Sequence, residues 1–117
     1  MATFSKVFLS GSTNGRGIKV AATATPGTLI HTAVAGTTNM DEVWLYVYNS
    51  HTSTVALTIE FGGTTAPDDN IKVSIPSQQG LLLVVPGLII RNELAVRAFA
   101  GTADVLVISG FVNRIEP

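Results

Sequence analysis

Residues 10–17 have the glycine spacing of a phosphate-binding loop. They read Ser-Gly-Ser-Thr-Asn-Gly-Arg-Gly and follow a short apolar run. A dinucleotide-binding loop of this kind must open a helix, because the N-terminal amides of that helix hold the pyrophosphate. Residues 18–21, Ile-Lys-Val-Ala, instead predict a strand, and no helical pattern follows them. We therefore expect a flexible loop without nucleotide, whose glycines and Arg16 are free to contact a partner.

The two histidines, His31 and His51, offer little for catalysis. Ser50 and Ser53 flank His51, but a catalytic triad depends on geometry and not on adjacency in sequence. The polar residues 49–53 predict a turn with His51 in solvent, and His31 lies in a predicted strand, where we expect it to be half-exposed. Two separate histidines without an H-x-H pair also argue against a metal-binding cupin. We expect no enzyme activity, no catalytic residue and no cofactor.

Two acidic pairs, Asp41-Glu42 and Asp68-Asp69, are the remaining candidates for chemistry. Adjacent residues in a strand point to opposite faces, so Asp41 and Glu42 make a poor acid–base pair. Asp68 and Asp69 lie in a Pro-Asp-Asp-Asn segment. Loop carboxylates of this kind could contribute to a calcium site, which needs six to eight oxygens, but the same segment forms an ordinary turn. We favour the turn and predict no metal site.

The composition is unusual for its low charge. Only 13% of the 117 residues are charged, about half the usual quarter, while 46% are hydrophobic and the net charge is -1. The length fits a single domain, residues 1–117. The charge balance gives no basic patch for nucleic acid, and the longest apolar-leaning run, residues 73–90, is broken by two prolines and so predicts no membrane span. Either the surface is rich in Thr and Ser, or partners cover much of it.

Hydrophobic residues recur with a period of two. In residues 54–61, Val55, Leu57, Ile59 and Phe61 form one face, and Thr54, Ala56, Thr58 and Glu60 form the other, which we expect to be wet. Turn signals separate eight or nine such short segments. This pattern predicts an all-β protein, an antiparallel β-sandwich of jelly-roll type. An immunoglobulin-like sandwich is the alternative.

Residues 42–49 are apolar on both faces, which predicts a central or doubly covered strand. Their aromatic row, Trp44, Tyr46 and Tyr48, is interpreted first as core packing and second as a subunit interface, where such residues are enriched. No Lys or Arg is interleaved for nucleic acid. Residues 81–90 contain Pro86-Gly87, which predicts an edge strand, a bulge or a corner.

Several segments together resemble small virion proteins of tailed bacteriophages, namely head decoration (cement) proteins. They are residues 41–49 (Asp-Glu-Val-Trp-Leu-Tyr-Val-Tyr-Asn), the strand end Phe61-Gly62-Gly63, the Pro86-Gly87 corner and residues 110–115 (Gly-Phe-Val-Asn-Arg-Ile). The resemblance covers most of the chain as a pattern of strands and corners. It implies a β-sandwich or jelly roll, usually trimeric, on the outer capsid surface at junctions between capsomers, without enzyme activity or cofactor.

We therefore expect a structural virion protein, a homotrimer that binds the major capsid protein and stabilises the shell. The alternative is a receptor- or carbohydrate-binding module of a phage fibre or head spike. The N-terminal residues 2–6 and the 11–17 loop are expected to face the capsid, and the aromatic strand or residues 81–85 to form subunit contacts. The expected contact residues are Ala2, Phe4, Lys6, Asn14, Arg16, Trp44, Tyr46 and Tyr48.

Overall fold

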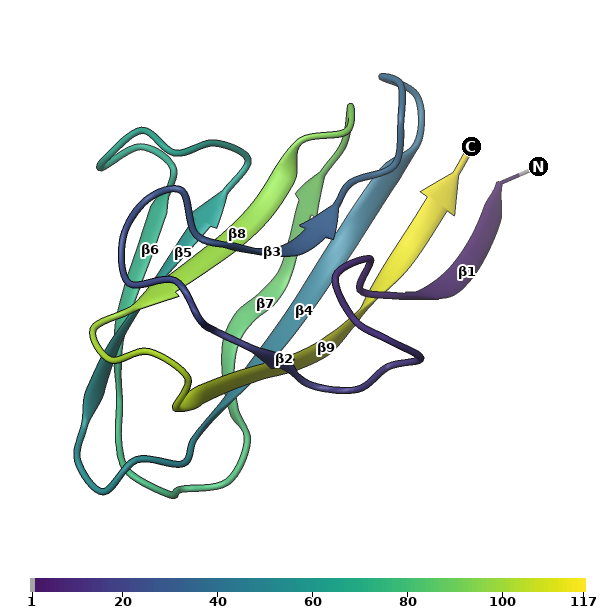
Figure 1. Ribbon diagram of the computed structural model, residues 1–117. Helices are drawn as coiled ribbons and strands as arrows, with labels where there is room; N and C mark the ends of the chain where they lie inside the picture. Colours follow the sequence, from purple (N-terminus) through teal and green to yellow (C-terminus); the bar gives the residue numbers. More distant parts are fainter. Residues whose placement is uncertain (1) are drawn as a thin grey trace.

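The computed structural model describes residues 2–117, which form nine β-strands and no helix (Figure 1). The strands are β1 (Thr3–Phe8), β2 (Ile18–Lys19), β3 (Thr28–Thr32), β4 (Met40–Asn49), β5 (Val55–Phe61), β6 (Asn70–Ile75), β7 (Leu82–Ile90), β8 (Ala95–Ala100) and β9 (Leu106–Glu116). A membrane-spanning helix is therefore absent from the described residues.

The strands form two antiparallel sheets that pack face to face. Sheet A has the order β1-β9-β4-β7, with β2 also paired to β9, and sheet B has the order β3-β8-β5-β6. The pairing is nested: β5 pairs with β6, β4 with β7, β3 with β8, and both β1 and β2 with β9. This is the arrangement of a long hairpin rolled into a jelly roll. The predicted antiparallel sandwich of eight to nine strands is confirmed.

The core lies between the two sheets and comes from alternate residues of their strands. Val43, Leu45 and Val47 of β4 are fully buried, as are Leu57 and Ile59 of β5. β4 lies between β9 and β7, which confirms the predicted central strand.

Gly110 allows an unusually close approach of β9 to β4. It lies opposite Leu45 in the register, and a Cβ built on it would overlap the carbonyl oxygen of Trp44. Any side chain at this position would therefore push the two central strands of sheet A apart.

The predicted irregularity at Pro86-Gly87 is confirmed. β7 is an edge strand of sheet A, and its register with β4 shifts between Val43 and Trp44 and again between Leu45 and Tyr46. Gly87 has a positive φ of 79° and lies against the indole ring of Trp44. Such bulges add twist and disfavour further strand pairing at an edge.

The expected wet face of β5 is wrong for two of its residues. Thr58 and Glu60 point outward from sheet B but are buried. Residues 25–27 of the β2–β3 connection cover Glu60. The Glu60 carboxylate accepts hydrogen bonds from the Thr25 hydroxyl (2.6 Å) and the Gly27 amide (2.7 Å). Glu60 thus anchors the connection to sheet B, which strand alternation alone does not reveal.

We expect Glu60→Ala to lower the free energy of unfolding by about 1–3 kcal/mol, since it leaves the buried Gly27 amide without an acceptor. Urea denaturation measures this loss. Glu93→Ala is the matched control, because Glu93 is an exposed loop residue, and its effect should stay within about 0.5 kcal/mol. Equal stability of the two variants would contradict the anchoring role of Glu60.

Candidate interaction face on the outer side of sheet A

The outward side chains of sheet A form a mostly apolar surface, called face A below. The strand register defines its members, since residues directly opposite each other on neighbouring strands share a face. They are Phe4, Lys6 and Phe8 of β1, Lys19 of β2, Val107, Ser109, Phe111, Asn113 and Ile115 of β9, Met40, Glu42, Trp44, Tyr46 and Tyr48 of β4, and Leu83, Pro86 and Ile89 of β7.

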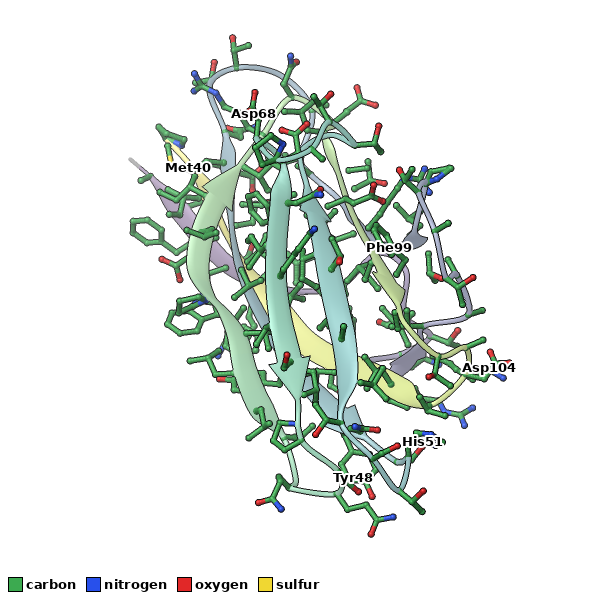
Figure 2. All side chains as sticks on the ribbon, turned by 90° about the vertical axis from the view of Figure 1, so that its left-hand side faces the viewer. Met40, Tyr48, His51, Asp68, Phe99 and Asp104 are labelled. Carbon is green, nitrogen blue, oxygen red and sulfur yellow. The ribbon has the colours of Figure 1, made fainter. Side chains whose placement is uncertain are left out.

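Face A exposes several large apolar side chains at its two edges. Phe4 and Phe8 on β1 are 72% and 64% exposed, and Ile89 on β7 is 59% exposed. Figure 2 shows Met40 and Tyr48, near the two ends of β4, at opposite ends of the molecule. Face A therefore runs along the length of β4, the central strand. Contiguous apolar surfaces of this kind mark interaction sites.

The aromatic row of β4 lies on face A and not in the core, so the interpretation as core packing is wrong. Trp44, Tyr46 and Tyr48 alternate with buried Val43, Leu45 and Val47 and are half-buried by their neighbours on the sheet. The indole of Trp44 stacks on Phe111 with ring centres 6.2 Å apart and an interplanar angle of 13°. The rings of Trp44 and Phe111 are thus nearly parallel and support each other on face A.

A polar row crosses face A beside Trp44. The Glu42 Oε1 atom accepts hydrogen bonds from the Trp44 indole (2.6 Å) and the Asn113 amide (2.9 Å). The hydrogen bonds from Asn113 and Trp44 hold the pKa of the Glu42 carboxyl below its usual value, so this carboxyl is charged at neutral pH. The Lys6 ammonium lies 4.6 Å from the centre of the Phe111 ring, over the face. Lys6, Asn113 and Glu42 stand side by side on three neighbouring strands.

The outer side of sheet B differs in character. Its outward residues include Thr32, Ala56, Thr58, Lys72, Ser74 and Arg97, with Leu29 and Phe99 as the large apolar exceptions. Part of it is covered by residues 25–27, since Arg97 donates a hydrogen bond to the Gly27 carbonyl (3.1 Å) and Glu60 binds the same segment. The two outer faces of the sandwich are therefore unequal, and face A is the larger apolar surface.

The expected contact residues fall into two groups. One group lies together on face A and consists of Phe4, Lys6, Trp44, Tyr46 and Tyr48. The sequence predicts capsid contact for the two residues of β1 and subunit contact for the aromatic row, so their shared surface is a new finding. Ala2, Asn14 and Arg16 are exposed, Ala2 just before β1 and the other two in the loop between β1 and β2. That loop borders face A, because Gly15 lies against the ring of Phe8.

His31 is fully buried, so the expected half-exposed position is wrong. Its Nδ1 atom accepts a hydrogen bond from the Ser10 amide (3.0 Å), and its Nε2 atom donates one to Asp41 (2.8 Å). Both ring nitrogens are occupied, which leaves neither available as a general base. His31 instead ties the start of the β1–β2 loop to β4.

Asp41 is the centre of this buried polar cluster. Arg114 binds it in bidentate fashion at 2.8 and 3.0 Å, and the Val34 amide also donates to it. Although burial opposes ionisation, hydrogen bonds from Arg114 and His31 hold the pKa of the Asp41 carboxyl below its usual value. Sequence reasoning missed the cluster. The available signal was strand alternation, because Asp41 has the same parity as buried Val43 and Leu45.

The acidic turn at residues 66–70 is held by local hydrogen bonds between Asp69 and Thr65. The Asp69 carboxylate accepts a hydrogen bond from the Thr65 amide (3.0 Å), and the Asp69 amide donates to the Thr65 carbonyl (2.9 Å). Within residues 2–117, no group of three or more His, Cys, Asp or Glu side chains could hold a metal ion.

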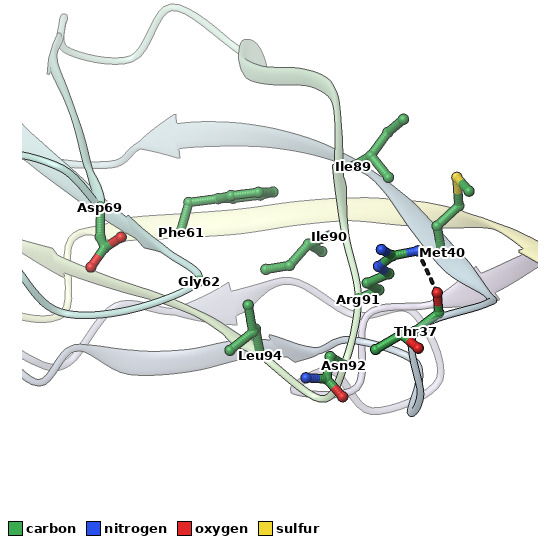
Figure 3. A pocket seen from close by; sticks show the side chains of 10 residues that line it. All are labelled: Thr37, Met40, Phe61, Gly62, Asp69, Ile89, Ile90, Arg91, Asn92 and Leu94. Atoms are coloured by element: carbon green, nitrogen blue, oxygen red, sulfur yellow. Dashed lines mark hydrogen bonds between the residues drawn. The ribbon is translucent and has the colours of Figure 1, made fainter.

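A hollow of about 620 Å³ adjoins face A at one end of the sandwich (Figure 3). Its lining residues are Thr37, Met40, Phe61, Gly62, Asp69, Ile89, Ile90, Arg91, Asn92 and Leu94. The Arg91 guanidinium is held at its rim by the Thr37 carbonyl (2.5 Å). Met40 and Ile89 belong to both surfaces, so the hollow extends the apolar area of face A around the end of β7.

Comparison of the chain with protein-family models, curated proteins and solved structures gives no match.

Proposed function

We propose that this protein is a structural virion protein, which binds the outer surface of a phage capsid as a homo-oligomer and stabilises the shell. The observation that carries the proposal is face A, a mostly apolar surface along the length of β4 whose edges expose Phe4, Phe8 and Ile89. A protein that works while covered by neighbours needs broad contact area, and apolar burial contributes about 25 cal/mol per Å². The low charge of the chain, 13%, fits such a role.

The site chemistry supports binding over catalysis. The one buried cluster of ionisable groups, among residues 2–117, uses His31, Asp41 and Arg114 to join β3, β4 and β9. Glu42, the carboxylate on face A, is ionised and fixed by Asn113 and Trp44. The carboxylates of Asp41 and Glu42 therefore accept hydrogen bonds from neighbouring side chains. These bonds hold the strands in position and leave neither group arranged for a substrate.

The test uses intact heads of a tailed phage whose major capsid gene lies beside the gene for this chain. The purified chain should co-sediment with these heads to a fixed stoichiometry and raise the temperature at which they release DNA, because each copy adds contact area across a joint between capsomers. Repetition over the shell multiplies a modest contact. Failure to co-sediment with such heads overturns the proposal.

Matched variants locate the surface in the same assay. Phe4→Ser combined with Phe8→Ser removes exposed apolar area from face A, and we expect it to weaken head binding about tenfold or more. Leu29→Ser removes an exposed apolar side chain from sheet B and should leave binding unchanged. The reverse order of effects would assign the contact to sheet B.

The alternative function is carbohydrate or receptor binding on a fibre or head spike. The half-buried, outward aromatic row favours it, together with a shallow hollow of about 380 Å³ beside that row, lined by Phe4, Ser5, Lys6, Glu42, Asn113 and Ile115. Trp44 is the only tryptophan, so its fluorescence reports directly on this surface. Saturable emission changes on titration with neutral oligosaccharides would support the alternative, and an unchanged spectrum counts against it.

A further inference from the structure

Face A has a repeating relation between the two columns of residues that flank β9. Phe4 of β1 and Met40 of β4 both lie opposite Ile115, and Lys6 and Glu42 both lie opposite Asn113. Phe8 and Trp44 both lie opposite Phe111, and Lys19 of β2 and Tyr48 both lie opposite Val107. Each residue on one side of β9 thus has a counterpart at the same height on the other side.

Three of these four pairs are chemically complementary. Phe4 and Phe8 match the apolar Met40 and Trp44, while the cation Lys6 matches the anion Glu42. Tyr46 lies opposite Ser109, and Gly17 lies beside Ser109 in the other column. Gly17 has no side chain, which leaves room for a tyrosine ring, and a Cβ at this position would meet Val107. The pattern would bring apolar side chains onto apolar ones and opposite charges together if the two columns were exchanged.

A twofold axis that runs parallel to β9 in the plane of contact makes this exchange. β1 and β4 run in the same direction, because both pair antiparallel with β9. The rotation therefore places each residue of β1 in one copy over the residue of β4 at the same height in the other copy. We propose that face A binds face A of a second copy of this chain about such an axis, with Lys6 of each copy against Glu42 of the other. The inference rests on the proposed function in that face A is covered by protein. The second copy covers the columns of β1, β9 and β4 and leaves the β7 residues of face A, Leu83, Pro86 and Ile89, for the capsid.

Other axes parallel to the strands give poorer pairings. An axis along β4 places Glu42 against the same residue of the second copy, which is repulsive. An axis midway between β9 and β4 exchanges β1 with β7 and places Lys6 against Ile89. That arrangement buries an ammonium on an apolar side chain without a carboxylate, which is costly. The axis along β9 avoids both penalties.

Both charges are available for a contact between copies. Within residues 2–117, ion pairs at 4.0 Å or less involve Lys19, His31 and Arg114 with Asp104 or Asp41, and neither Lys6 nor Glu42 takes part. The two hydrogen bonds to Glu42 both use Oε1, which leaves Oε2 to accept one from the second copy. The Lys6 ammonium already lies over the face, at the ring of Phe111.

The contact area is sufficient for a reversible dimer. Three overlapping strand columns about 4.8 Å apart and ten residues long, at about 3.4 Å per residue, give about 500 Å² per copy and about 1,000 Å² in total. That total is near the lower limit for a specific interface, about 1,000–1,200 Å². We therefore expect a monomer–dimer equilibrium that depends on concentration, in contrast to the homotrimer that the resemblance implies.

Sedimentation equilibrium of the full chain over a wide concentration range, combined with charge-reversal variants, tests the proposal. The wild type should approach twice its mass of 12.2 kDa. Lys6→Glu and Glu42→Lys should each weaken dimerisation about a hundredfold, since each replaces two attractive pairs with two repulsive ones. An equimolar mixture of these two variants should dimerise again, because both pairs across the heterodimer are then attractive. No change within one chain produces this rescue.

Lys72→Glu is the matched control, because Lys72 is exposed on the outer side of sheet B, and it should dimerise like the wild type. The fluorescence of Trp44 should shift to shorter wavelength with concentration in the wild type, in Lys72→Glu and in the mixture, but not in Lys6→Glu or Glu42→Lys alone. If Glu42→Lys does not fold, Lys6→Glu on the exposed edge strand β1 still decides the outcome.

A wild type that stays monomeric, a trimeric mass, or a mixture that stays monomeric overturns the twofold contact. Failure of this inference and failure of the proposed function remain distinguishable. A monomeric chain that still binds phage heads overturns only the twofold contact. A dimer that does not bind heads overturns the capsid role and keeps the contact.

Discussion

Replacing Asp41 with asparagine should lower the free energy of unfolding by about 3 kcal/mol, the lower end of the range for breaking a buried ion pair. The substitution leaves the Arg114 guanidinium without its bidentate carboxylate and the His31 Nε2–H with a weaker acceptor. Asp41 is fully buried, while the Arg114 side chain is 26% exposed and can recover some hydration, which places the loss at the lower end. Urea denaturation followed by the fluorescence of Trp44 measures it.

The pH dependence of stability provides a second measurement of the same residue. The pKa of Asp41 is lowered in the folded protein, so its contribution is complete above the ordinary carboxyl value of 3.8 and is lost as the pH falls through the lower folded value. The wild type should therefore lose stability more steeply than Asp41→Asn on acidification below that pH. The exposed Asp68→Asn is the control, and it should follow the wild type. Parallel curves for Asp41→Asn and wild type would contradict the assignment.

Gly110→Ala is expected to be at least as damaging, with a loss of about 3 kcal/mol or more. The added Cβ would overlap the Trp44 carbonyl oxygen and approach the backbone of Leu45, so β9 must move away from β4 in the middle of sheet A. Overpacking in a rigid core costs about 1–3 kcal/mol, and here backbone hydrogen bonds between the two central strands are lost as well. Thermal unfolding by circular dichroism measures the effect.

Gly101→Ala is the matched glycine control. A Cβ at Gly101 would make only ordinary contacts with Ala56, at 3.9 Å or more, and its backbone is not in the left-handed region. Its stability should therefore stay within about 0.5 kcal/mol of the wild type. Gly110→Ala behaving like Gly101→Ala would mean that β9 and β4 can separate without cost.

The fold was predictable because hydrophobic alternation is a local signal. The alternation in residues 54–61 identified β5, and the doubly apolar residues 42–49 identified the central strand β4. Pro86-Gly87 identified the irregular edge strand β7. Each of these depends on the order of residues in one segment, and the sequence contains that order directly.

Face A was only partly predictable, because it depends on register between strands far apart in the chain. The aromatic row of β4 was visible, but its side of the sheet was not, since Val43 and Trp44 are both apolar. That Phe4, Phe8 and Trp44 share one surface follows only from the pairing of β1 and β4 with β9. The burial of Glu60 and His31 depends on loops that cross the sheets, which alternation within a strand cannot predict.

The nested pairing of strands also sets the order in which this chain can fold during synthesis. The β5–β6 hairpin joins strands that are close in sequence, whereas the pairings of β1, β2 and β4 with β9 span much of the chain. Loop closure over such distances is slow, so contact order favours growth outward from β5–β6. β9 lies between β1 and β4 in sheet A, so β4 has no neighbour on that side until the ribosome has made β9. The apolar side of β4 is exposed to aggregation during that time.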